Sequence, residues 1–81
     1  MRRLPAIELP RTSSDELVAT LVRAGGRVLA RQEHGVLLAI RRRLVFVPSA
    51  SWVSEAVLAD SLRAARLTPE SFRELRADAL G

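Results

Sequence analysis

Hydrophobic periodicity changes abruptly at Gly25-Gly26, and this change restricts the fold more than any other feature of the chain. Before the glycines, apolar residues recur at helical spacing: Leu17, Val18, Leu21 and Val22. Ser13 followed by Glu16 has the spacing of a capping box, and the glycine pair is a helix stop. The sequence therefore predicts a helix over residues 14–24.

After the glycines the chain is typical of β-structure, with strands expected at residues 27–33, 36–41 and 44–47. His34-Gly35 separates the first two at the spacing of a two-residue hairpin, with glycine in the place that tolerates positive φ. Arg42-Arg43 is the expected tight connection between the second and third. These signals predict a three-stranded antiparallel meander.

The second half of the chain is helical. An apolar stripe predicts a helix over residues 55–66, and Thr68-Pro69-Glu70 starts a further helix with a capping threonine, an N1 proline and an acid in the first turn. Residues 1–12 contain two prolines without periodicity and are expected to form an extended lead-in. The prediction is one α+β domain over residues 13–81, with its helices on one face of the sheet.

Two of the predicted strands are apolar on both faces, whereas a meander covered by helices on one side should alternate apolar and polar residues. A second apolar surface is therefore expected on the side away from the helices. Such surfaces commonly mark a partner interface, formed here by a dimer or by another protein. Its expected members are Leu29, Leu37, Ala39, Val45 and Val47.

Composition excludes several classes of function. The chain has no cysteine and one histidine, so disulfides, redox chemistry and a structural metal are not expected, and neither is a cofactor. No stretch approaches the ~20 apolar residues of a membrane span, and no signal-peptide core follows the first arginines. A cytoplasmic protein without membrane contact is the expectation.

Positive charge is concentrated in the first half of the chain. All 13 basic residues are arginine, and residues 1–50 hold nine of them against four acids, whereas residues 51–81 hold four against five. Arginine presents a planar fork suited to phosphate, so RNA is an expected partner. With three aromatic residues in the chain, contact with a structured backbone is favoured over base stacking.

Five segments follow one another in order: Arg-Leu-Pro at 3–5, Glu-Leu-Val through Ala-Gly at 16–25, Val-Leu-Ala-Arg-Gln at 28–32, Val-Phe-Val-Pro at 45–48, and residues 62–72. Together they resemble the HicA family of bacterial toxins over nearly the whole chain. The resemblance implies a double-stranded-RNA-binding-like fold, metal-independent cleavage of mRNA, and a HicB-type antitoxin as partner.

The family carries Gly-Ser-His after its Arg-Gln, with the catalytic histidine starting the second strand. Here Arg31-Gln32 is followed by Glu33-His34-Gly35, and Val36 occupies the histidine position. His34 is the single histidine and hence the candidate catalytic acid-base group. It is also a residue type that is tolerated in a hairpin turn.

Candidate phosphate contacts are Arg31, Gln32, Arg41, Arg42 and Arg43. Of these, Arg31 is the arginine expected near His34, because the run at 41–43 follows the opposite end of the second strand, close to 20 Å away. The run has a second interpretation, as solvated charge that protects the sheet edge. Three functions remain open: an RNA-cleaving toxin, a catalytically inactive relative that binds RNA or an antitoxin, and a protein-interaction module using the apolar sheet face.

Overall fold

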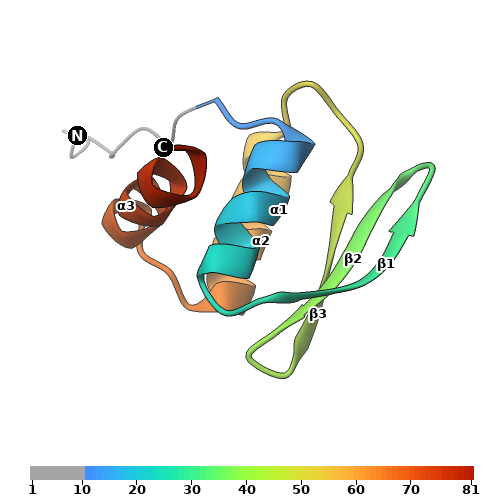
Figure 1. Cartoon of the computed structure of the whole chain (residues 1–81), viewed down its shortest axis with the longest axis horizontal. Helices are drawn as coiled ribbons and strands as arrows, with labels where there is room; N and C mark the ends of the chain where they lie inside the picture. Colours follow the sequence, from blue (N-terminus) through green and yellow to red (C-terminus); the bar gives the residue numbers. More distant parts are fainter. Residues whose placement is uncertain (1–10) are drawn as a thin grey trace, which may run out of the picture.

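A computed structural model describes residues 11–81, so that all but the last two residues of the predicted lead-in lie outside the described part of the chain. The elements follow in the order helix, three strands, two helices (Figure 1): α1 (Ser14–Arg23), β1 (Arg27–Gln32), β2 (Gly35–Ile40), β3 (Arg43–Pro48), α2 (Glu55–Ala65) and α3 (Pro69–Leu80). The predicted α+β class, with a three-stranded antiparallel sheet, is confirmed.

Local capping signals explain where the helices begin. The Ser13 side chain accepts a hydrogen bond from the Glu16 backbone N–H, and the Glu16 side chain accepts one from the Ser13 N–H, so the predicted capping box is formed. At α2 and α3 the caps are one-way: the side chains of Ser54 and Thr68 accept hydrogen bonds from the backbone N–H groups of Val57 and Ser71. Each cap satisfies a donor that the first helical turn leaves free.

The strands are joined by two-residue turns that each lie one residue earlier than the sequence predicts. Gln32 pairs with Gly35, so the first turn is Glu33-His34 and not His34-Gly35. Ile40 pairs with Arg43, so the second turn is Arg41-Arg42 and not Arg42-Arg43.

The glycine of the first hairpin has a different role from the one predicted. Among the described glycines, positive φ occurs at Gly25 and not at Gly35. Instead, a Cβ on Gly35 would lie 2.4 Å from the Val47 carbonyl oxygen and 2.5 Å from Cζ of Phe46. Glycine is required there because a neighbouring strand and an aromatic ring approach the backbone closely.

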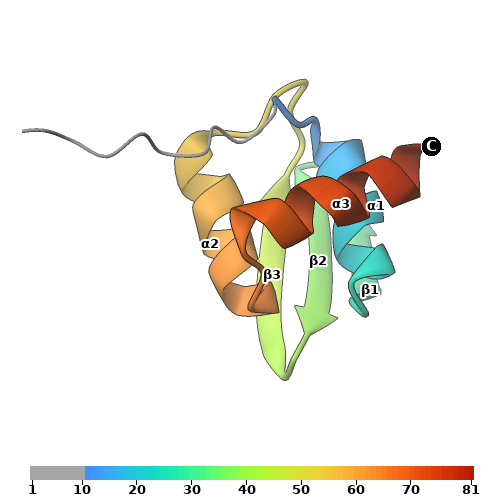
Figure 2. The ribbon, with the colours of Figure 1, turned by 90° about the vertical axis from the view of Figure 1, so that its left-hand side faces the viewer.

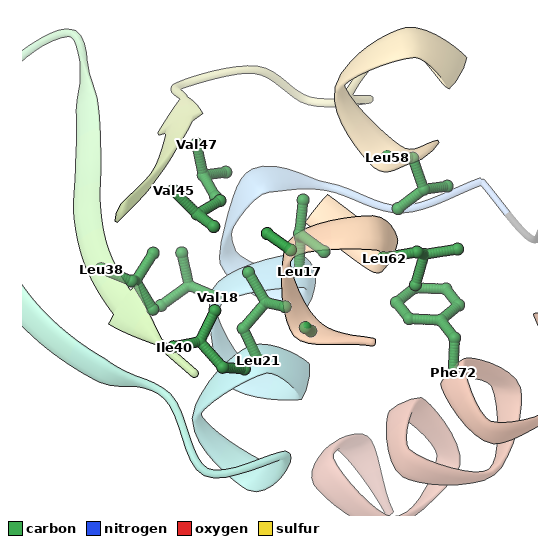
Figure 3. Close-up of a cluster of buried hydrophobic side chains, with 12 residues drawn as sticks. Leu17, Val18, Leu21, Leu38, Ile40, Val45, Val47, Leu58, Leu62 and Phe72 are labelled. Atoms are coloured by element: carbon green, nitrogen blue, oxygen red, sulfur yellow. The ribbon is translucent and has the colours of Figure 1, made fainter. Parts of the chain in front are cut away.

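The helices lie on one side of the sheet, as predicted (Figure 1). α1 and α2 contact the strands, and α3 packs against α1 on the side away from the sheet (Figure 2). The core fills the space between the sheet and the helices (Figure 3), and it includes Leu17 and Leu21 of α1, Leu38 of β2, Leu62 of α2 and Phe72 of α3.

Candidate functional site

The face of the sheet turned away from the helices is apolar, and no helix or strand of residues 11–81 covers it. A residue and its directly opposed cross-strand partner point to the same face. Leu37 pairs with Phe46 and Ala39 with Leu44, and these four side chains form what we call the open face. Leu44 is 69% exposed and Phe46 is 45% exposed. Exposed apolar surfaces of this kind commonly mark sites of protein contact.

The predicted membership of this face is wrong at two positions. Val45 and Val47 are 7% and 0% exposed and belong to the core, because they pair with Leu38 and Val36 on the side that faces the helices. Phe46 takes their place on the open face together with Leu44.

The remaining predicted members lie on or beside this surface. Leu37 and Ala39 belong to the open face and are half-buried. Leu29 is 47% exposed, and it sits where the register of β1 shifts between Val28 and Ala30. This irregularity interrupts the pairing of β1 with β2 and marks a bulge in an edge strand.

His34 lies in the exposed turn between β1 and β2. Its backbone oxygen accepts a hydrogen bond from the Ser49 N–H at 2.9 Å, and the Ser49 hydroxyl donates one to the Glu33 backbone oxygen at 3.4 Å. None of the hydrogen bonds or ion pairs formed within residues 11–81 involves the imidazole. The ring therefore lacks the orienting partner that a general base ordinarily has.

The two residues predicted to accompany His34 do not form one site with each other. Arg31 pairs with Val36 on the helix-facing side of the sheet, whereas Gln32 pairs with Gly35 and follows the other face. Arg31 lines a cavity of about 630 Å³ that also contains the carboxylates of Asp15 and Asp78. These acidic groups oppose the approach of a phosphate to Arg31.

The turn between β2 and β3 has an unusual backbone. Arg41 and Arg42 have φ values of 49° and 65°, in the left-handed region where side chains other than glycine, asparagine and aspartate are disfavoured by roughly 1–2 kcal/mol each. The Arg41 Nε donates a hydrogen bond to the Ala65 backbone oxygen at 2.7 Å. Arg41 thus satisfies a carbonyl at the C-terminus of α2, where a positive charge is also favourable.

The five predicted phosphate contacts fall into two groups. Arg31 and Gln32 lie near the His34 turn, whereas the arginines at 41–43 lie at the opposite end of β2. The six residues of β2 separate the two turns by about 17 Å, so one phosphate cannot bridge them.

Arg27 joins the second group, which the sequence did not indicate. It opposes Ala39 at the start of β1, and it lines a hollow of about 360 Å³ with Gly25, Ile40, Arg41 and Arg42. The signal in the sequence was weak: an arginine placed directly after the two glycines that turn the chain into β1.

Other kinds of site find little support. Residues 11–81 contain no group of three or more histidine, cysteine or acidic side chains placed to hold a metal ion. No helix in the same residues is long and apolar enough to cross a membrane. Comparisons of the chain with protein-family models, with curated proteins and with solved structures found no match.

Proposed function

We propose that the chain is a HicA-like member of a toxin–antitoxin pair, that it acts by binding, and that the open face is where a HicB-type antitoxin docks. The elements follow in the order helix, three strands and two helices, and the helices lie on one face of the sheet. This order is compatible with the double-stranded-RNA-binding-like arrangement that the resemblance implies. In this account α3 is an addition that packs on α1.

The proposal rests on the observation that the helices cover one face of the sheet and leave the other face exposed. α1 and α2 contact one face, while Leu44 and Phe46 remain 69% and 45% exposed on the other. Burying a large apolar side chain stabilises a complex by about 1.5–3 kcal/mol, so these two residues could supply the centre of an interface.

Charge favours an acidic partner. None of the residues in the three strands is acidic, and exposed Arg27 and Arg43 lie at one end of the sheet. A partner that places apolar side chains on the open face and carboxylates at that end would match it in both respects. We therefore expect the docking surface of the HicB-type partner to be apolar at its centre and acidic at its rim.

Cleavage of RNA by His34 is not part of this proposal. The imidazole has no orienting partner within the described residues, and Arg31 shares its cavity with two carboxylates. These features favour binding over acid-base chemistry, because metal-free cleavage needs a positioned base and positive charge at the same phosphate.

The test is calorimetric titration of the chain with the product of the neighbouring gene, which the proposal expects to encode a HicB-type protein. Phe46→Glu and Leu44→Glu place a charge on the open face and should each weaken binding by at least roughly 30-fold. Leu80→Glu, at a side chain 46% exposed on α3, is the matched control and should leave the affinity unchanged.

Circular dichroism of each variant separates loss of binding from loss of fold. The proposal is contradicted if no such gene exists. It is also contradicted if folded Phe46→Glu and Leu44→Glu variants bind as tightly as the original chain.

A further inference from the structure

We propose that Arg27, Arg41 and Arg42 form a binding site for the phosphodiester backbone of a nucleic acid at the turn end of the sheet. The site shares Arg27 with the rim proposed to meet the HicB-type partner, but it depends on guanidinium groups and not on the apolar side chains of the open face. Figure 1 shows the elements that build it together at the lower edge of the molecule: the α1–β1 connection, the β2–β3 turn and the end of α2.

The arginines surround a hollow whose described lining carries no opposing charge. The other residues of the 11–81 range that line it are Gly25, Ala39 and Ile40, none of them acidic. By contrast, the larger cavity beside α1 holds two aspartates with its two arginines. An anion entering the turn-end hollow therefore meets positive charge without a competing carboxylate from the described part of the chain.

The guanidinium groups are available to a ligand. The guanidinium groups of Arg27 and Arg42 make no hydrogen bond or ion pair with any residue in the 11–81 range. The Arg41 Nε donates to the Ala65 backbone oxygen, and this bond fixes the guanidinium plane, while its Nη atoms have no partner among residues 11–81. A guanidinium held in place loses less side-chain entropy when it takes up a phosphate oxygen.

Backbone strain supplies an observation independent of charge. A hairpin turn with positive φ at both central residues is normally filled by asparagine and glycine, whereas this one holds two arginines, Arg41 and Arg42. Strained backbone clusters at ligand-binding sites because function retains it. The hydrogen bond to Ala65 gives a structural reason for an arginine at position 41. No contact within the described residues gives such a reason at position 42.

The extent of the charge favours a polyanion over a single phosphate. Arg43 continues the run beyond the turn, and Arg66 follows Ala65, the residue that Arg41 contacts. Five arginines thus lie around this end of the molecule, more than one phosphate group can engage. No aromatic residue lines the hollow, so contact is with the backbone and not by base stacking.

The experiment measures fluorescence anisotropy of the full chain with labelled 20-base-pair RNA duplexes of two unrelated sequences, from about 50 to 200 mM KCl. The same duplexes as DNA form a second arm, and vesicles containing anionic phosphatidylglycerol form a third. The decisive variant is Arg42→Gly, because glycine relieves the left-handed conformation and should keep or raise the melting temperature. Arg73→Ala is the control, since it removes the same charge from α3 beside Glu70 and Glu74.

Arg42→Gly is expected to weaken duplex binding roughly three- to tenfold and to lower the slope of log affinity against log salt by about 0.9, equally for both sequences. Arg73→Ala should change neither quantity. Binding to RNA alone supports a site that is selective for the RNA backbone. Binding to RNA and DNA alike supports a site that accepts either backbone. Binding by neither duplex, binding to vesicles alone, or equal effects of Arg42→Gly and Arg73→Ala would overturn it.

Discussion

The Nε of Arg41 donates a hydrogen bond to the backbone oxygen of Ala65 at 2.7 Å, and this contact ties the β2–β3 turn to the C-terminus of α2. The two residues are 24 positions apart in the sequence. The bond joins the β2–β3 hairpin to the helix layer at Ala65, a fully buried residue of the apolar core.

Removing this bond should destabilise the fold. Arg41→Ala keeps the Cβ, and hence the left-handed strain, while it removes the donor and the charge at the helix terminus. We expect the free energy of unfolding to fall by about 1–2 kcal/mol in urea denaturation. Arg42→Gly in the same turn should be neutral or stabilising, by up to about 1 kcal/mol. Equal stability of Arg41→Ala and the original chain would show that the bond contributes nothing in solution.

Glu16 should make part of the stability dependent on pH. The Ser13 backbone N–H donates to its Oε1 at 2.9 Å and the Arg76 Nη2 lies 3.3 Å from its Oε2, and these partners lower the pKa of Glu16 below its ordinary value of 4.5. Because the pKa is lower in the folded state, the carboxylate stabilises the fold above pH 4.5, and this contribution is lost as the pH falls through the lowered value.

Urea unfolding at several pH values between about 7 and 3 measures this contribution. Glu16→Gln keeps the capping-box hydrogen bond but cannot ionise, so its stability should fall less over this range than that of the original chain. Glu74→Gln, at an exposed position on α3, is the control and should follow the original curve. Superimposable curves for Glu16→Gln and the original chain would show that ionisation of Glu16 does not contribute to the pH dependence of stability.

His34→Ala tests the candidate catalytic residue. The side chain is in an exposed turn, so stability should change by no more than about 0.5 kcal/mol. In a metal-free assay with cellular RNA, we expect neither the original chain nor the variant to cleave. Cleavage by the original chain that disappears in His34→Ala would establish a ribonuclease and refute the proposal that the domain acts by binding alone.

The helices and the order of the strands could be predicted because their signals are local. The Ser13–Glu16 capping box, the Thr68-Pro69 start and the apolar periodicities lie within a few residues of the elements that they define. The turn positions could not be predicted in the same way. Gly35 is required by a contact with Val47 and Phe46 on another strand, and nothing near it in the sequence shows this.

The residues of the candidate surfaces were harder to predict than the helices, because tertiary structure decides which side chains meet on a surface. The assignment of Val45 and Val47 to the outer face failed because the face of β3 is set by its pairing with β2, which places Phe46 outward opposite Leu37. Arg27 was missed because the loop after α1 meets the β2–β3 turn only in the folded chain.

The measurement that tests the central claim most directly is methyl NMR of the leucine-labelled chain during titration with the proposed HicB-type partner. The proposal predicts that the methyl signals of Leu37 and Leu44, on the open face, shift or broaden first and most. The signals of Leu75 and Leu80, on α3, should change little. Changes confined to α3, or none at saturating partner, would show that the open face is not the docking surface.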